Sequence, residues 1–275
     1  MREHEKNRAL VIGFIGAGKM ARCLISGMLQ NNWPHQQILV SCLEPVKHQD
    51  LGEQGIEVVN DNLQLVQCSD VIILACKPQQ ASLALVGLKG KLDKGCVISV
   101  AAGLPVAFLH KLLGDDVSII RTMPNTPAIL GLGVTAFYAE KEVVEKFGAL
   151  CQTLFESIGE WVWIDDESLM DAVTATSGSG PAYVFLMAES MIKGAIELGL
   201  PEKIAEKLVI QTLYGAAHLL KNGVESPKTL RENVTSKGGT TQAALESFSE
   251  DQFEVIVKKA LAAARDRGRV LGQIN

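Results

Sequence analysis

At 275 residues, the chain is long enough to bury one large hydrophobic core or two modest ones. Hydrophobic residues make up 47% of the sequence and aromatic residues only 5%, a balance typical of a soluble α/β or helical protein. The net charge of −5 lacks the basic footprint of nucleic-acid-binding proteins, so we expect no nucleic-acid partner.

The chain begins with MREHEKNRAL, which carries charges of both signs, and the apolar run that follows is interrupted by several glycines and by Lys19. A run this short and this rich in glycine is typical of neither a signal peptide nor a membrane span. We therefore expect a cytoplasmic protein with no membrane partner.

The six cysteines and five histidines form no recognisable metal-binding pattern. There is no C-x-x-C pair and no H-E-x-x-H motif. Several cysteines lie in apolar, strand-like runs, as Cys76 does in VIILAC, which indicates small buried hydrophobic residues in a reducing compartment. We expect no metal site.

From Ala9 to about Ile164, short apolar runs alternate with helix-like segments. Continuous Val-, Ile- and Leu-rich runs are typical of strands in a sheet covered on both faces. The predicted strands are ALVIGFI, QILVSC, DVIILAC, GCVISVA, VSIIRT and GVTAFY, and the helical stretches are Met20–Gln30, Asn62–Cys68, Gln79–Gly87 and Val106–Gly114. This repetition predicts a Rossmann-like, doubly wound, mainly parallel sheet.

The first predicted strand ends in a glycine-rich turn, GFIGAGKMA, which contains a G-x-G-x-x-A fingerprint. Gly16 permits the tight turn, Gly18 lets a pyrophosphate approach the backbone, and Ala21 allows the next helix to pack closely on the sheet. The pyrophosphate would lie on the free N–H groups that open the helix at Met20. The turn therefore predicts a dinucleotide site.

The end of the second predicted strand, where the choice of dinucleotide is usually made, has the sequence SCLEPVKH. Glu44 would accept hydrogen bonds from the adenosine ribose and repel a 2′-phosphate, which favours NADH. Lys47 and His48 could instead face that phosphate, or all three side chains could belong to a solvated turn. The sequence leaves NADPH and NADH open.

Two further loops follow strands, ACKP (residues 75–78) and MPNTP (residues 123–127). Ligands of open α/β sheets bind outside the carboxyl ends of the strands. The prolines on both sides of Asn125 and Thr126 restrict the backbone, so the polar side chains between them are held in place. Each loop alone could be only a rigid turn.

After Asp165 the strand signals end and helical patterns take over. Asp171 to Leu198 is one long segment rich in alanine and methionine, interrupted near Ser177–Pro181, and a second helix extends from Pro201 to about Lys221. Ser226-Pro227 predicts the start of a short helix.

The last helix is predicted from a capping-box spacing, Ser249 with Gln252. We place a domain boundary near residues 160–167. It divides the chain into a dinucleotide-binding Rossmann domain, residues 1–164, and an all-helical domain, residues 165–275.

One helix of the second domain, VFLMAESMIKGAIELGL, has little polar face. A helix that is apolar all round must be covered on all sides, which a small helical domain can hardly do alone. An intertwined homodimer is the simplest solution. A helix packed inside a compact monomer remains the alternative.

Taken in chain order, GFIGAGKMA, ACKPQ, SVAAG, MPNTPA, SGSGPAY and NVTSKGGTT resemble the motif series of the pyrroline-5-carboxylate reductases. The resemblance extends with matching spacing from Ile12 to the last helix. It implies NAD(P)H-dependent hydride transfer to the imine of 1-pyrroline-5-carboxylate, giving L-proline in the last step of proline biosynthesis. It also implies a substrate-binding helical domain that forms a homodimer or a larger oligomer.

The resemblance implies a set of residues around the cofactor, expected to be NADPH, with NADH open because of Glu44. The glycine turn would lie under the pyrophosphate, Asn62 would contact the adenosine end, and later loops would border the nicotinamide. The cofactor-binding set is Gly16, Ala17, Gly18, Lys19, Met20, Glu44, Asn62, Ala75, Lys77, Pro78, Ala101, Ala102, Gly103, Asn125 and Thr126.

The resemblance also places the substrate at NVTSKGGTT, residues 233–241. It implies that the substrate contacts Val234, Ser236, Gly239 and Thr240. Backbone N–H groups of residues 236–240, ahead of a helix, would form a cradle for the carboxylate. The hydroxyl of Thr241, the expected catalytic residue, would hydrogen-bond the ring nitrogen as it becomes an amine.

The sequence departs from the family pattern at two positions. Glu44 stands where the family commonly has serine, asparagine or arginine, and Lys237 stands where it usually has proline. Lys237 could add positive charge to a carboxylate site or point into solvent.

Two rival functions stay open. The β-hydroxyacid dehydrogenases also join a Rossmann domain to helices, but the lysine that they carry after a glycine-rich turn is missing after Gly178-Ser179-Gly180. A nucleotide-sensing protein that binds NAD(P) without turnover would need no intact substrate loop, whereas this chain keeps Ser236, Gly239 and Thr241.

Overall fold

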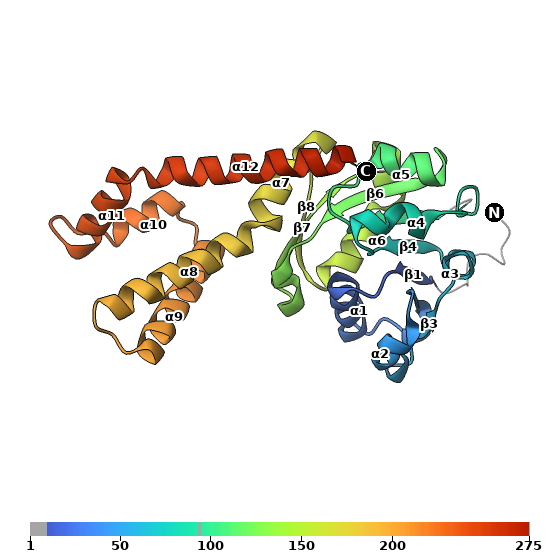
Figure 1. Ribbon diagram of the computed structural model, residues 1–275, viewed down its shortest axis with the longest axis horizontal. Helices are drawn as coiled ribbons and strands as arrows, with labels where there is room; N and C mark the ends of the chain where they lie inside the picture. Colours follow the sequence, from blue (N-terminus) through green and yellow to red (C-terminus); the bar gives the residue numbers. More distant parts are fainter. Residues whose placement is uncertain (1–9, 93–94, 275) are drawn as a thin grey trace. The chain divides into compact units, whose positions relative to one another are not determined.

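The computed structural model describes residues 10–92 and 95–274, and the chain divides into two compact units. The first unit extends to Gly178 and takes in the end of the chain from Ala264; the second is Ser179–Ala263. Figure 1 shows the elements of both units. The predicted boundary after residue 164 lies directly behind the last strand and stays a prediction.

The first unit contains an eight-stranded sheet with the order β3-β2-β1-β4-β5-β6-β7-β8. Every neighbouring pair is parallel except β6 and β7, which confirms the predicted Rossmann-like, mainly parallel sheet. The strands are β1 (Ile12–Ile15), β2 (Ile38–Ser41), β3 (Glu57–Val59), β4 (Val71–Leu74), β5 (Cys96–Ser99), β6 (Ser118–Met123), β7 (Gly133–Tyr138) and β8 (Gly159–Trp163).

The two edge strands of the sheet, β3 and β8, were not predicted from the sequence. β3 has only three residues, and β8 alternates exposed and half-buried side chains because one of its faces is open. β7 is antiparallel to β6 because a short turn, the 3-10 helix Thr126–Leu130, joins them in place of a crossover helix.

Helices cover both faces of this sheet, so the strands feed two separate cores. Phe14 points into one core and its neighbour Ile15 into the other. The first core is completed by α1 (Lys19–Gln30), α2 (Gln49–Glu53) and α6 (Lys141–Glu156), and the second by α3 (Asn62–Cys68), α4 (Ala81–Leu85) and α5 (Val106–Leu113). The helix predicted at Gln79–Gly87 is shorter, because a 3-10 turn, Pro78–Gln80, precedes α4.

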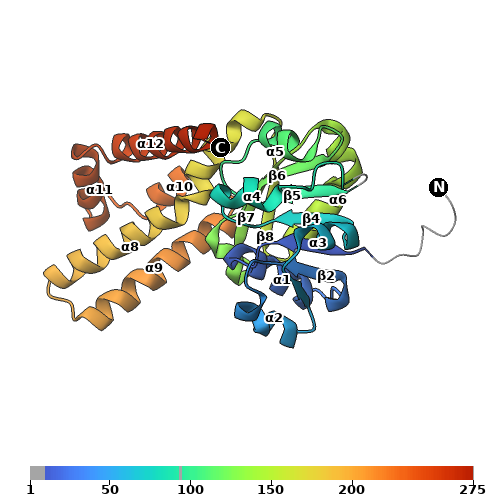
Figure 2. The same cartoon turned by 45° about the vertical axis from the view of Figure 1, so that its right-hand side comes forward.

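The predicted interruption near Ser177–Pro181 is a π-helix, Thr174–Gly178, between α7 (Met170–Val173) and α8 (Gly180–Glu197). π-helical turns are rare and often mark functional segments. The remaining helices are α9 (Glu202–Asn222), α10 (Pro227–Asn233), α11 (Thr240–Glu250) and α12 (Phe253–Ile274). No strand occurs in the described residues after β8, as predicted for a helical C-terminal domain. Figure 2 shows α8 and α9 side by side.

The predicted capping box at Ser249 and Gln252 is wrong. Ser249 lies in the last turn of α11, and Gln252 adopts a positive φ of 56° in the turn that follows. The N–H of Gln252 donates to the carbonyl of Ser249 at 3.0 Å, and the carbonyl of Gln252 accepts from the N–H of Val255 at 2.9 Å. Ser249 therefore belongs to the end of α11, and Gln252 itself, not Ser249, is the residue that precedes α12. None of the helices in the described part of the chain is long and apolar enough to cross a membrane.

Candidate active site

The glycine turn draws three strands of the first unit together. Gly16 has a φ of 105°, and a Cβ atom there would lie 2.8 Å from the carbonyl oxygen of Ala75, so only glycine fits. Its N–H donates to the carbonyl of Ser41 at 2.8 Å. Gly18 then opens α1 with no side-chain cap, which leaves the first N–H groups of the helix available to an anion.

A cavity of about 360 Å³ lies at this edge of the sheet, beside the carboxyl ends of β1, β2 and β4. It is the position where open α/β sheets bind their ligands. Several of the predicted cofactor-binding residues line it, namely Gly16, Ala17, Gly18, Glu44, Asn62, Ala75 and Lys77. Lys19 and Met20 open α1 next to the turn, and Pro78 begins the 3-10 turn after Lys77.

The amide of Asn62 is engaged inside the wall of this cavity. Its Oδ1 accepts from the Ser41 hydroxyl, and its Nδ2 donates to the carbonyl of Ala84 at 2.7 Å. Asp61 caps the same helix, α3, by accepting from the N–H of Leu63 at 2.7 Å. Asn62 therefore fixes the spacing between β2 and α4 at the predicted adenosine end.

Five charged or titratable side chains gather after β2, where the predicted ribose site lies. Glu44 forms an ion pair with Lys47, and Arg22 of α1 forms one with Asp50 of α2. A second nitrogen of Arg22 lies 2.8 Å from Nδ1 of His48. Hydrogen bonding to Arg22 lowers the pKa of Asp50. Sequence reasoning missed Arg22 and Asp50, which are 28 positions apart and meet only in the folded chain.

Two thiols, Cys42 and Cys76, also line the cavity. Burial raises the pKa of Cys76 to about 11 and also raises that of Cys42. Both thiols are therefore protonated near neutral pH and are poor nucleophiles. Among the described residues, no group of three His, Cys, Asp or Glu side chains could hold a metal ion.

The cavity does not include the predicted residues that follow β5 and β6. Ala101 is buried, and its N–H lies 3.4 Å from the Ser99 hydroxyl; Ala102 is exposed. Gly103 has a positive φ of 72° and faces the backbone of Gly272 in α12. Thr126, at the end of the MPNTP loop, is exposed.

Asn125 is held by two hydrogen bonds that its predicted role did not foresee. Its Oδ1 accepts from the N–H of Val134 in β7 at 3.0 Å, and its Nδ2 donates to the carbonyl of Ser177 at 3.2 Å. Beside it, Gly178 lies so close to Met123 that a Cβ atom would come within 2.4 Å of the methionine methyl group. The MPNTP loop thus grips the π-helix from which α8 continues.

In the second unit, NVTSKGGTT forms the turn between α10 and α11. Gly238 has a positive φ of 69°, and its N–H donates to Oε1 of Gln242 at 2.8 Å. The N–H of Gly239 donates to the carbonyl of Ser236 at 3.0 Å. Two of the N–H groups expected to form the carboxylate cradle are therefore already engaged in the chain.

Thr240 and Thr241 occupy the first two positions of α11, where the backbone N–H groups have no partner within the helix. Thr241 is half-buried, whereas Val234, Ser236, Lys237 and Thr240 are exposed. An anion at this turn would therefore meet the free N–H groups of α11 and the positive end of its dipole.

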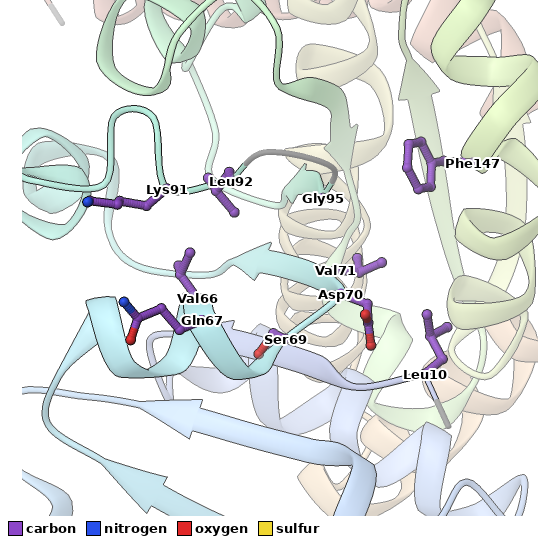
Figure 3. Close-up of a pocket in the computed structure, with 10 residues that line it drawn as sticks. All are labelled: Leu10, Val66, Gln67, Ser69, Asp70, Val71, Lys91, Leu92, Gly95 and Phe147. Atoms are coloured by element: carbon purple, nitrogen blue, oxygen red, sulfur yellow. The ribbon is translucent and has the colours of Figure 1, made fainter. Parts of the chain in front are cut away.

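A second hollow of about 410 Å³ lies at the amino end of β4, near Val71. Figure 3 shows Asp70 and Lys91 among the side chains around it. The carboxylate of Asp70 accepts from the N–H of Val11 at 2.9 Å, so it is engaged in holding β1. This edge is opposite to the one where α/β sheets bind ligands, and we assign it no function.

Two family models match the chain. Residues 167–271 match the family described as pyrroline-5-carboxylate reductase dimerisation, and residues 11–103 match the one described as NADP oxidoreductase, coenzyme F420-dependent. The second match covers the glycine turn and the cavity, and the first covers the turn between α10 and α11.

Curated relatives are similar over their whole length. The chain is 40% identical to the pyrroline-5-carboxylate reductase of Pseudomonas aeruginosa, with 95% of this chain and 97% of the relative covered. It is 37% identical to the enzyme of that name from Arabidopsis thaliana, with 95% of each covered.

Solved structures of pyrroline-5-carboxylate reductases are also similar to this chain. A pyrroline-5-carboxylate reductase from Coxiella burnetii superposes with a TM-score of 0.90 at 34% identity, covering 96% of this chain and 99% of the other. The Plasmodium falciparum enzyme, solved with NADP bound, gives a TM-score of 0.85 at 30% identity, covering 96% and 98%. The chain belongs to the pyrroline-5-carboxylate reductase family of oxidoreductases.

Proposed function

We propose that the chain reduces 1-pyrroline-5-carboxylate to L-proline, with a nicotinamide cofactor at the cavity of the first unit as hydride donor. The observation that carries the proposal is the similarity to curated pyrroline-5-carboxylate reductases, which spans both the cavity and the turn between α10 and α11. Reduction of this imine is the last step of proline biosynthesis.

The residues of the cavity fit a dinucleotide. Gly16, with its positive φ and its close approach to Ala75, makes the tight turn, and the uncapped start of α1 at Lys19 and Met20 offers N–H groups to a pyrophosphate. Asn62 and Glu44 line the adenosine end, and Lys77 and Pro78 the next strand end. We assign Ala101, Ala102, Gly103, Asn125 and Thr126 to the nicotinamide side.

The residues assigned to the substrate bind and orient the imine. When bound, the reduced nicotinamide supplies a hydride, and the imine, once protonated, is a good acceptor. The N–H groups at the start of α11, with Ser236 and Gly239 beside them, hold the carboxylate. The hydroxyl of Thr241 hydrogen-bonds the ring nitrogen, while Val234 and Thr240 border the ring. Catalysis then rests on positioning and on excluding water.

The predicted cofactor is NADPH, with NADH open because Glu44 lines the cavity. The helices of the second unit form the homodimer, since α8 has no buried residue in the single chain. A cytoplasmic location stays a prediction.

The experiment is an absorbance assay of NADPH and NADH oxidation with 1-pyrroline-5-carboxylate, in which L-proline is quantified as product. A β-hydroxyacid tested with the oxidised cofactors is the control. We expect cofactor oxidation and equimolar proline with the imine alone. Nucleotide binding without turnover would favour the sensor, and hydroxyacid oxidation would favour the rival dehydrogenase.

A further inference from the structure

The charged side chains after β2 combine into a neutral cluster at the cavity. Glu44, Lys47 and His48 line the cavity, and Arg22 and Asp50 stand behind His48. Each cation has a carboxylate partner, Lys47 with Glu44 and Arg22 with Asp50. The two pairs leave no net positive charge where a 2′-phosphate of NADPH would lie.

The guanidinium of Arg22 donates hydrogen bonds to several groups of the protein. Its Nε donates to the carbonyl of Ala17 at 3.2 Å, Nη1 pairs with Asp50, and Nη2 donates to the second oxygen of Asp50 at 3.0 Å. This bidentate arrangement is the strong form of an arginine–carboxylate pair. It ties the glycine turn to α2 and occupies three nitrogens of the guanidinium with protein acceptors.

The same contacts fix the state of His48. A guanidinium offers only donors, so Nδ1 of His48, at 2.8 Å from Nη2 of Arg22, must accept and carries no proton. With Nδ1 accepting from Arg22, Nε2 is the nitrogen of His48 that can donate to a ligand. Such a donor suits a ribose hydroxyl as well as it suits a phosphate.

Glu44 adds the discriminating charge. Its side chain is 62% exposed and lines the cavity, so its carboxylate can accept from ribose hydroxyls. Its pair with Lys47 is exposed and contributes little to stability. The carboxylate nevertheless cancels the lysine charge that would otherwise attract a 2′-phosphate.

We propose that Glu44 and Asp50 together make this chain selective for NADH, because each carboxylate engages a cation that would otherwise meet the 2′-phosphate of NADPH. Glu44 is the residue that determines specificity by contact. Asp50 is a positioning residue that acts through Arg22 and His48. The inference rests on the proposed function, in which a nicotinamide cofactor occupies the cavity.

The test compares two ligands that differ only in the 2′-phosphate. The affinities of adenosine 2′,5′-bisphosphate and 5′-AMP are measured by calorimetry, and those of NADPH and NADH by fluorescence, without turnover. The variants are Glu44→Gln, Asp50→Asn and the double variant. Glu53→Gln is the matched control, since it removes one negative charge from α2 and does not belong to the cavity wall.

We expect the wild type to bind the two adenosine ligands with Kd values within about threefold of each other, and NADH more tightly than NADPH. The double variant should bind the bisphosphate about tenfold more tightly relative to 5′-AMP, by freeing charge-assisted hydrogen bonds. Added salt should reduce that gain. Glu53→Gln should leave the ratio unchanged.

A wild type that prefers NADPH, or a double variant with an unchanged ratio, would overturn the inference and leave the proposed function standing. Failure of every nucleotide to bind would sink both. If Asp50→Asn disturbs the folding of α2, Glu44→Gln still tests the inference. Glu44 lies outside α2, and its exposed side chain can be changed without loss of core packing.

Discussion

The two units of this chain differ in how completely they bury their apolar side chains. The first covers both faces of its sheet and buries large residues such as Phe14, Phe137 and Phe155. In the second, only Ala205 and Val209 are buried, while Phe185 is 66% exposed. Apolar surface on this scale marks an interaction site. The first unit therefore has a complete core of its own, whereas the second leaves most of its apolar side chains exposed in the single chain, which supports the proposed homodimer.

The largest expected effect tests that difference directly. Phe185→Asp places a charge on the apolar face of α8, which costs little in a monomer and much in a buried interface. We expect loss of the dimer in size-exclusion chromatography with light scattering, together with loss of activity. Ile129→Asp, at an apolar residue of the first unit that is 75% exposed, should keep the mass of the wild type. Equal masses for both variants would contradict the comparison.

Thr241→Ala should separate the chemistry of the second unit from nucleotide binding in the first. Loss of one hydrogen bond that strengthens in the transition state lowers kcat about 100-fold. Steady-state kinetics with 1-pyrroline-5-carboxylate measures this, and NADH fluorescence should give an unchanged Kd. Thr241→Ser, which keeps the hydroxyl, should retain most of the activity. Unchanged turnover in the alanine variant would remove Thr241 from the mechanism.

Glu167→Ala tests the stability of the first unit, to which Glu167 belongs. Oε1 of Glu167 accepts from the buried Arg121 at 2.8 Å and from the N–H of Val106 at 2.8 Å. Its removal leaves Arg121 without its carboxylate, which we expect to cost about 3 kcal/mol of unfolding free energy in urea. Glu167→Gln, which keeps an acceptor, should cost less. Unfolding free energies equal to that of the wild type in both variants, neither of which carries the charge, would show that the charge pair is dispensable.

Asn125→Asp tests the hydrogen bond by which the MPNTP loop contacts the π-helix. The aspartate keeps the acceptor for Val134 but loses the donor to Ser177. If Asn125 only positions this segment, kcat should fall about tenfold, the cost of one hydrogen bond beside an unpaired carbonyl, with nucleotide Kd unchanged. A weaker nucleotide Kd would instead favour the predicted contact with the cofactor. Asn222→Asp, which likewise loses a donor to a backbone carbonyl but at an exposed position of α9, is the control.

The smallest effect concerns Cys76 in the cavity wall. Because burial raises its pKa to about 11, the protonated thiol is the form that the fold favours. Its contribution to stability is intact below the ordinary thiol pKa and is lost as the pH rises towards 11. At pH 8, iodoacetamide should label the exposed Cys68 well before Cys76, as judged by mass spectrometry. Faster labelling of Cys76 would show that this wall opens.

Much of the architecture was predictable because local signals agreed with the fold. Apolar runs and the glycine turn gave the parallel sheet and the position of the cavity, since strand ends and helix starts are encoded in adjacent residues. The edge strands β3 and β8 were missed, because a short or half-exposed strand carries little hydrophobic signal. The capping-box spacing at Ser249 misled, because the pattern of α11 continues through it.

By itself, the sequence determined the fold class, the family motifs, and the glycines that the two turns require, because each depends on residues that are neighbours in the chain. Only the tertiary structure decided which polar groups remain free for a ligand. It engages the amides of Asn62 and Asn125 within the protein and brings Arg22 to Asp50. Hydrogen bonds between distant segments form only when the fold brings those segments together, so a local sequence pattern cannot predict them.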